Sequence, residues 1–141
     1  MVIEINNLTN FSVDKKKIST VAKIVLKGEN RGTEILSLAF VDKEEIKKLN
    51  KKFRKKNKPT DVLSFLLNEK ECFGEIIICP EVVKENALKY GIEFRKEMLK
   101  VFVHGILHLC GYDHEKSKKE ENIMEMKEKK YLSGQIKSKR F

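Results

Sequence analysis

Residues 94–110 form a segment that is apolar on nearly every side when it is drawn as a helix. A helix at the surface of a globular protein carries a single apolar stripe, so a helix without a polar face has to be buried. The rest of the chain must therefore surround this segment. Because the 141 residues are close to the ~150 of a typical domain, the sequence predicts one domain around a central buried helix.

Shorter segments of strand and helix character alternate along the rest of the chain. Alternating patterns and apolar runs predict four strands, at 2–6, 35–41, 62–67 and 73–79. Helical periodicity predicts five helices, at 13–27, 42–56, 80–90, 94–110 and 117–132. A hairpin connection at 68–72 should make the last two strands antiparallel neighbours. We therefore expect an α+β fold in which a mixed four-stranded sheet is packed with about five helices.

Three signals mark helix ends. Asp42 with Glu45, and Ser117 with Glu120, each match a capping box, in which the first side chain accepts a hydrogen bond from the backbone of the second residue. Pro59 should end the helix that follows Asp42, because the residue before a proline is disfavoured in helical geometry. The sequence thus predicts both ends of the helix at 42–56 and the start of the helix at 117–132.

The predicted helix at 42–56 has an apolar face and a strongly basic face. Ile46, Leu49 and Phe53 should point inward. Between residues 47 and 58 there are eight basic residues and no acid: Lys47, Lys48, Lys51, Lys52, Arg54, Lys55, Lys56 and Lys58. The whole chain has 30 basic and 21 acidic residues, a net charge of +9. This balance favours a polyanionic partner such as nucleic acid, although a merely solvated helix face is the alternative.

Several classes of protein are disfavoured by what the sequence lacks. No run approaches the ~18 apolar residues that a membrane helix needs, and no basic region followed by an apolar stretch marks an export signal at the N-terminus. The three cysteines form no CxxC pair. We expect a cytoplasmic protein without membrane contact, consisting of a single domain at 1–133 and a disordered basic tail at 134–141.

All three histidines of the chain lie within eleven residues, in the segment HGILHLCGYDH. His104 and His108 are four residues apart, which places them on one face of a helix. Gly111 can end that helix and turn the chain, so that His114 returns towards the other two. Three imidazoles with a fourth position left open are the ligand set of a catalytic zinc site. Imidazole also suits Cu, Fe and Ni, but the expected tetrahedral geometry favours one Zn²⁺ per chain.

The spacing His-x-x-x-His-x-x-Gly-x-x-His matches the ligands of the metzincin proteases. Gly105 stands where those enzymes carry the glutamate that acts as general base. The sequence therefore predicts the metal ligands of such a site without its usual route to peptide hydrolysis.

Three blocks of the sequence resemble the YbeY endoribonuclease family: HGILHLCGYDH, LNKKFRKKNKPTDVLSF at 49–65 and GEIIICPE at 74–81. The resemblance runs through nearly the whole chain. It implies a metal held by His104, His108 and His114, and cleavage specific to single-stranded RNA. It also implies a role in the maturation of the 16S rRNA 3′ end and in ribosome quality control, with the small ribosomal subunit and its assembly factors as partners.

The same resemblance assigns a role in RNA handling or catalysis to Arg54. The sequence departs from the usual family pattern at Asn57, where an aspartate is common, and more mildly at Phe53, Leu66 and Glu75. With three histidines on the metal, none is left as a general base, so the reaction would be metal-assisted hydrolysis. The expected RNA-binding residues are Lys51, Lys52, Arg54, Lys55, Lys56 and Lys58.

Four further side chains have two open interpretations. Asp113 could orient an imidazole or cap the turn after Gly111, and Tyr112 could stack on an unpaired base or pack in the core. Thr60 and Asp61 could face the cleft or cap a turn. At the level of function, the alternatives are a non-catalytic ribosome-assembly factor that binds RNA and holds a structural zinc, a metalloprotease, and a hydrolase of a small phosphate or amide.

Overall fold

The computed structural model describes residues 3–32, 34–69 and 72–135. The strands are β1 (Ile3–Asn7), β2 (Leu36–Phe40), β3 (Val62–Glu69) and β4 (Cys72–Ile78). The helices are α1 (Lys15–Gly28), α2 (Lys43–Arg54), α3 (Pro80–Tyr90), α4 (Phe94–Leu109) and α5 (Lys118–Leu132). The predicted ranges agree with these bounds to within two residues at every end.

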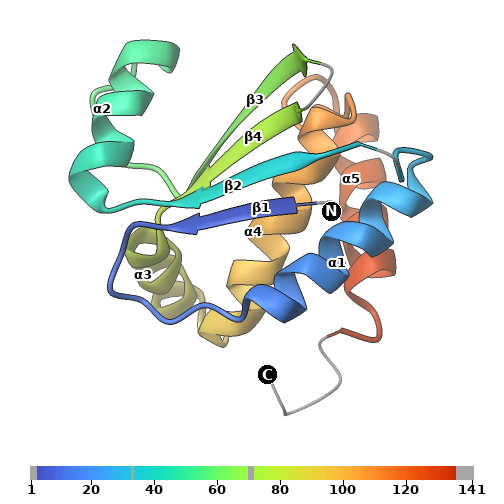
Figure 1. The fold of residues 1–141 in the computed structure, drawn as a ribbon, viewed down its shortest axis with the longest axis horizontal. Coiled ribbons are helices and arrows are strands. Elements are labelled where there is room, and N and C mark those ends of the chain that lie inside the picture. Colours follow the sequence, from blue (N-terminus) through green and yellow to red (C-terminus); the bar gives the residue numbers. More distant parts are fainter. Residues whose placement is uncertain (1–2, 33, 70–71, 136–141) are drawn as a thin grey trace.

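The four strands form one mixed sheet in the order β1-β2-β4-β3 (Figure 1). β1, β2 and β4 run parallel to one another, whereas β3 pairs antiparallel with β4. The predicted α+β class, the mixed sheet and the antiparallel pair are thus confirmed. The pair is longer than predicted, because β3 continues to Glu69 and β4 already begins at Cys72, so both strands extend into the expected connection.

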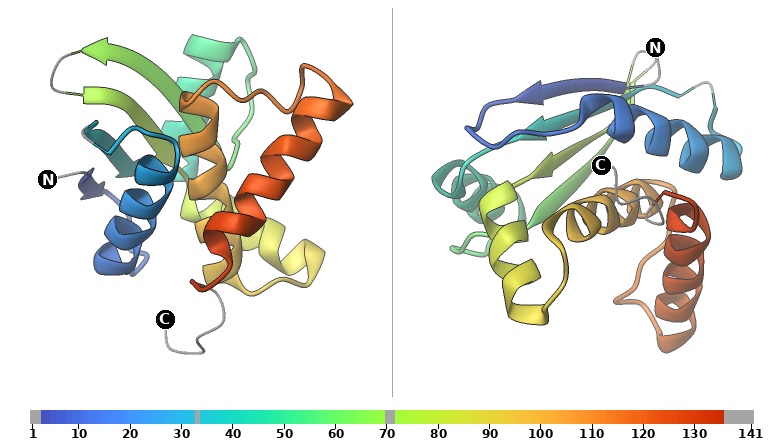
Figure 2. Two further views of the ribbon diagram at one scale, coloured as in Figure 1. Left: turned by 90° about the vertical axis from the view of Figure 1, so that its right-hand side faces the viewer. Right: turned by 90° about the horizontal axis from the view of Figure 1, so that it is seen from below.

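Helix α4 is the centre of the fold, as its sequence predicted. It contacts β3 and β4 on one side and α1, α3 and α5 on the others (Figure 2). Phe102, Val103, Ile106 and Leu107 are buried completely or almost so. Since this helix touches five other elements, its position determines where its side chains place any functional group.

Helix α2 packs on the opposite face of the sheet. Neighbouring residues of a strand point to opposite faces, and Ile76 belongs to the core around α4 whereas Ile77 belongs to a second cluster with Ile46 of α2. The prediction that Phe53 points inward is wrong: its side chain is 54% exposed, and its ring only meets the ring of Phe65, 5.1 Å away. One buried turn of α2 is enough to cover the small second cluster.

The end of α2 differs from the prediction for a local reason. The helix ends at Arg54 because Lys55 adopts a left-handed conformation, with φ of 61°. The backbone N–H of Lys56 donates to the carbonyl of Asn50, and the buried Asn50 amide donates to the carbonyl of Lys58 at 2.8 Å. The chain therefore leaves the helix before Pro59, and the last three basic residues of the cluster lie on a loop.

Both predicted capping boxes place their first side chain as expected. Asp42 accepts a hydrogen bond from the backbone of Glu45 at 2.9 Å, and Ser117 accepts one from the backbone of Glu120 at 3.1 Å. Most of the predicted tail, residues 136–141, lies outside the described residues. Within the described part of the chain, none of the helices combines the length and the apolar character needed to cross a membrane.

We predict that Gly74→Ala destabilises the protein by about 1–3 kcal/mol, the usual range for overpacking. A Cβ atom on Gly74 would lie 2.9 Å from the backbone oxygen of Phe65 and 2.7 Å from Leu109 Cδ1. The measurement is urea unfolding. Gly32→Ala is the control, since its Cβ would approach nothing closer than Lys27 Cα at 3.9 Å; equal unfolding midpoints for the two variants would contradict the prediction.

Candidate metal centre

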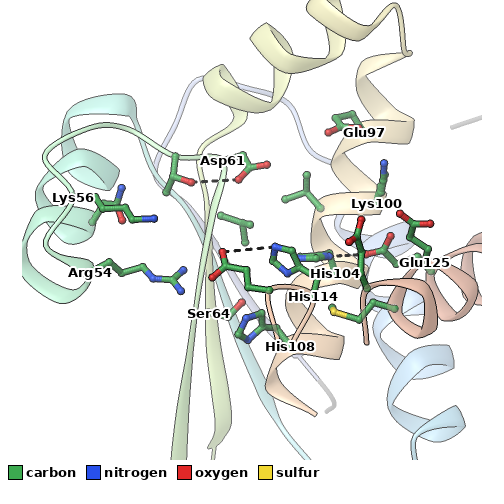
Figure 3. Close-up of a pocket in the computed structure, with 18 of the residues that line it drawn as sticks. Arg54, Lys56, Asp61, Ser64, Glu97, Lys100, His104, His108, His114 and Glu125 are labelled. Atoms are coloured by element: carbon green, nitrogen blue, oxygen red, sulfur yellow. Dashed lines mark hydrogen bonds and ion pairs between the residues drawn. The ribbon is translucent and has the colours of Figure 1, made fainter. Parts of the chain in front are cut away.

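A pocket of about 530 Å³ lies between α4, α5, the start of β3 and the loop that follows α2 (Figure 3). All three histidines line it. They are joined by basic and hydroxyl-bearing residues on the β3 side and by several glutamates on the α4–α5 side. The residues that matter below are Arg54, Lys56, Lys58, Thr60, Asp61, Ser64, Glu97, Lys100, His104, His108, His114, Glu115, Glu121, Glu125 and Glu128.

The rings of the three histidines lie near one another, but the donor atoms close enough to share one metal ion belong to His108, Asp113 and His114, and His104 is outside this group. His104 and His108 project from the last turns of α4, and His114 returns from the loop that begins at Gly111, whose φ of 106° favours glycine. The ring centroids of His104 and His114 are 4.8 Å apart, and His108 lies 6.4 Å and 6.3 Å from them. In a tetrahedral zinc site with Zn–N bonds of about 2.1 Å, the centroids would be about 5 Å apart, so the His104–His114 pair is near this separation and both pairs that include His108 exceed it.

The donor atoms themselves fit a metal ion. One ring nitrogen of His114, Nδ1, is buried and has no hydrogen-bond partner among the described residues, which leaves its lone pair or proton unsatisfied. Donor atoms of His108, Asp113 and His114 all lie within 4.8 Å of one another. Asp113 was not predicted as a ligand. Its Oδ1 accepts a hydrogen bond from the backbone N–H of Glu115 at 3.0 Å. The same carboxylate therefore caps the turn and also lies near the donor atoms of His108 and His114.

His104 is held by a carboxylate that the sequence did not single out. Its Nδ1 lies 2.6 Å from Oε1 of Glu128, on α5. Only 9% of the Glu128 side chain is exposed, against 28% for His104. The two residues are 24 positions apart along the chain, so no local pattern marks them as partners.

His108 is in the protonation state that metal binding requires. Burial, followed by the neighbouring imidazole of His104, lowers the pKa of His108 below its ordinary value. Its imidazole is therefore neutral at pH 7, and only neutral imidazole binds a metal.

Gly105 separates the two histidines of α4 and faces the sheet. A Cβ atom there would lie 3.2 Å from both Ile76 Cγ2 and Ser64 Oγ, and the Ser64 hydroxyl lies 3.4 Å from the Gly105 carbonyl oxygen. A glutamate at this position, as in the metzincin pattern, would have to enter the interface between α4 and the strands. The close packing of α4 on the sheet thus disfavours a larger side chain at 105.

The predicted basic residues divide into two groups. Arg54, Lys56 and Lys58 line the pocket, and Figure 3 shows the Arg54 guanidinium pointing from α2 towards the histidines. Lys51, Lys52 and Lys55 are exposed and lie outside the described lining. The helix was expected to carry all of them except Lys58, but it ends at Arg54, so its outer face and the following loop present them in different directions.

Thr60 and Asp61 face the cleft, which is one of the two roles that the sequence left open. The two side chains are hydrogen-bonded to each other, with 3.4 Å between Thr60 Oγ1 and Asp61 Oδ1, and both line the pocket. They extend the polar β3 side of the pocket at the end away from His108 (Figure 3).

A sequence model of the family described as Endoribonuclease YbeY matches residues 4–135. The chain belongs to the YbeY family. A protein of Thermotoga petrophila named Endoribonuclease YbeY is 43% identical over 118 residues, which are 84% of this chain and 75% of that protein. One of the same name from Thermosipho melanesiensis is 40% identical over 129 residues, 88% of this chain and 92% of that protein.

The fold agrees with this membership. The solution structure of a Thermotoga maritima protein superposes on this YbeY-family chain with a TM-score of 0.70 and 35% identity, covering 95% of this chain and 91% of that one. The likeness thus extends well beyond the three motifs that first suggested the family.

In this YbeY-family chain, a second polar cluster contacts the loop that carries His114, on the side away from the pocket. Glu29, at the end of α1, accepts hydrogen bonds from Tyr112 at 2.6 Å, from Lys127 at 2.9 Å and from Tyr131. Tyr112 is therefore tied into this cluster and packed against the core, which decides between its two interpretations in favour of packing. The cluster links α1, the loop before His114 and α5.

The contacts within the Glu29 cluster shift the pKa values of its members. Burial alone would raise the pKa of Glu29, but the hydrogen bonds from Tyr112, Tyr131 and Lys127 outweigh it and hold the pKa below its ordinary value. Burial and the contact with Glu29 raise the pKa of Tyr131 to about 12. Both shifts show that the charged carboxylate is the stable form in the fold.

We predict that Glu29→Gln lowers the free energy of unfolding at pH 7 by about 1.5–3 kcal/mol, the range for hydrogen bonds to charged groups. Because the folded-state pKa of Glu29 is depressed, its contribution is present above the unfolded-state pKa and is lost as the pH falls through the folded-state pKa. The gap between wild type and variant in urea unfolding should therefore narrow below pH 4.

The control for this measurement is Glu34→Gln, whose side chain is 37% exposed and lies 4.0 Å from Arg31. It should change stability by less than about 0.5 kcal/mol at any pH, as expected for a surface pair. A Glu29→Gln deficit that is the same at pH 7 and at pH 3 would show that the charge of Glu29 is irrelevant.

Proposed function

We propose that this chain is a metal-dependent endoribonuclease that cleaves single-stranded RNA, acting in 16S rRNA 3′-end maturation and in ribosome quality control. The observation that carries the proposal is the convergence of three imidazoles in a pocket whose opposite side presents Arg54. Relatives named Endoribonuclease YbeY support the reaction class. The catalytic domain is residues 1–133, and 134–141 is a basic extension.

The metal in this proposal is one Zn²⁺ per chain, held by His104, His108 and His114. When bound, it would provide a nucleophilic water near neutral pH and polarise a phosphoryl oxygen. The chain's own contribution is to present two imidazoles from α4 and one from the loop after Gly111. Asp113 is near enough to His108 and His114 to serve as an additional donor.

Arg54 is the proposed catalytic side chain outside the metal site. Its planar guanidinium can bind two oxygens of one phosphate, which would hold the scissile group and stabilise the charge that develops on it. Lys56 and Lys58, on the same side of the pocket, would bind neighbouring phosphates. Lys51, Lys52 and Lys55 would extend this attraction outside the pocket, so binding should weaken steeply with salt.

The charge distribution of the pocket indicates how RNA would lie in it. Glu97, Glu121, Glu125 and Glu128 form the α4–α5 side, where Lys100 is the only basic residue of the described lining. Like charges repel, so a phosphate backbone would be confined to the side of Arg54. The strand would therefore cross the metal centre with its phosphates towards β3 and the loop after α2.

The exposure of the ligands favours an enzyme over an assembly factor with a structural zinc. The side chains of His104 and His114 are 28% and 40% exposed and line an open pocket, whereas structural zinc sites are closed by four protein ligands. The metalloprotease alternative is disfavoured by Gly105, which has no room for a general base. Three cysteines without disulfides support a cytoplasmic location, where rRNA, the small ribosomal subunit and its assembly factors would be the partners.

The decisive experiment measures metal content and RNA cleavage on one purified sample. We expect about one zinc ion per chain, and cleavage of labelled single-stranded RNA that is lost with a chelator and in His108→Ala. Double-stranded RNA of the same sequence serves as the matched substrate control. Zinc at full occupancy with cleavage no greater than that of His108→Ala would favour the assembly factor instead.

We further predict that Arg54→Glu retains metal and fold but lowers kcat/KM for RNA on the order of 100-fold, the scale of losing one transition-state donor. Arg54→Lys, which keeps the charge but not the fork, should fall between this variant and wild type. Lys23→Glu, on the exposed face of α1, makes the same charge change away from the pocket and is the control. Equal losses of kcat/KM in Arg54→Glu and Lys23→Glu would show that Arg54 acts only through the general attraction of its charge for RNA.

A further inference from the structure

The contact between His104 and Glu128 has the geometry of a charge-assisted hydrogen bond. The separation of 2.6 Å between Nδ1 and Oε1 lies just below the range of about 2.7–2.9 Å that is usual between a charged nitrogen donor and a carboxylate oxygen. Glu128 is nearly buried, and burying a carboxylate is unfavourable unless a donor satisfies it. His104 is the described partner of that carboxylate.

The contact determines which nitrogen of His104 is free. A neutral imidazole carries its proton on one nitrogen and a lone pair on the other. Because a carboxylate only accepts hydrogen bonds, Nδ1 must carry the proton, and Nε2 is left with the lone pair. Nε2 is then the atom that His104 can offer to the centre it shares with His108 and His114.

We propose that Glu128 is a positioning residue of the metal centre: it fixes the tautomer and ring orientation of His104, so that Nε2 is presented to the metal ion. This inference rests on the proposed metal site and deepens it. A carboxylate behind a metal-bound histidine also makes the imidazole a stronger donor. The C-terminal helix α5, which supplies no metal ligand, thereby becomes part of the centre.

The position of Glu128 is itself fixed by its neighbours on α5. Lys127, the preceding residue, and Tyr131, one turn later, both donate to Glu29 at the end of α1. These bonds hold α5 against the rest of the fold on one side while Glu128 reaches His104 on another. The orientation of His104 thus depends on a helix that is anchored independently of the metal.

The test compares three variants of the full chain. Glu128→Met removes the acceptor and keeps the length of the side chain, and Glu128→Gln keeps one acceptor oxygen but removes the charge. Glu125→Gln is the charge control: it removes the same charge from the same helix and the same pocket, without contact to His104. Thermal unfolding of the metal-free proteins establishes that each variant is folded.

The first readout is zinc affinity, measured by competition with a chromophoric chelator. Removing the partner of a metal-bound histidine typically weakens binding 10- to 100-fold, so we expect a loss of about that size in Glu128→Met and a smaller one in Glu128→Gln. Glu125→Gln should lose less than about twofold. Equal losses in Glu125→Gln and Glu128→Gln would overturn the proposal, because charge alone would then explain them.

The second readout needs no metal. Nitrogen-15 NMR of the metal-free protein at pH 8 reports which nitrogen of each neutral imidazole is protonated. His104 should carry its proton on Nδ1 in wild type and lose this preference in Glu128→Met. An unchanged tautomer in Glu128→Met would overturn the proposal.

These readouts separate the inference from the proposed function. A wild-type protein that binds zinc and shows the Nδ1–H tautomer, but cleaves no RNA, would contradict the nuclease and leave the role of Glu128 intact. If Glu128→Met fails to fold, the ratio between Glu128→Gln and Glu125→Gln decides: at least threefold weaker zinc binding in Glu128→Gln supports the positioning role, and a ratio near one overturns it.

Discussion

The burial of α4 is the constraint on which the rest of the structure depends. An apolar helix of this length has to be covered on all sides, and the sheet, α1, α3 and α5 do so. Gly105 lets the helix approach β3 and β4 closely. His104 and His108 lie on the side of α4 that lines the pocket, so the two histidines project from a mostly buried helix while they still reach solvent.

Around this helix, opposite charges are placed on opposite sides of one pocket. The basic side comes from α2 and its loop, which pack on the far face of the sheet through little more than Ile46. The acidic side comes from α4 and α5. His104 of α4 contacts Glu128 of α5, and α5 is hydrogen-bonded to Glu29 at the end of α1. The metal centre and its acidic side are therefore one firmly connected unit, whereas the phosphate-binding side is a separate and more lightly attached one.

The local features of the molecule could be predicted from sequence, and the long-range ones could not. Periodicity and capping residues predict the nine helices and strands of the described residues. The spacing of the histidines predicts that their rings lie near one another. Both kinds of pattern depend on residues that are close along the chain. Glu128 and Glu29 were missed because their partners lie 24 and up to 102 positions away, and a glutamate on a polar helix has no local signature. Phe53 was misplaced because helical periodicity does not say how much of the sheet is left to cover.

The order of the elements along the chain determines when, during synthesis, the contact between His104 and Glu128 can form. A polypeptide leaves the ribosome with its N-terminus first, so the sheet and α4 are available for folding before α5. All three histidines are synthesised before Glu128, yet His104 acquires its carboxylate partner only when α5 has docked. For a protein of a nuclease family, this sequence of events would delay a fully formed centre until α5 has been synthesised.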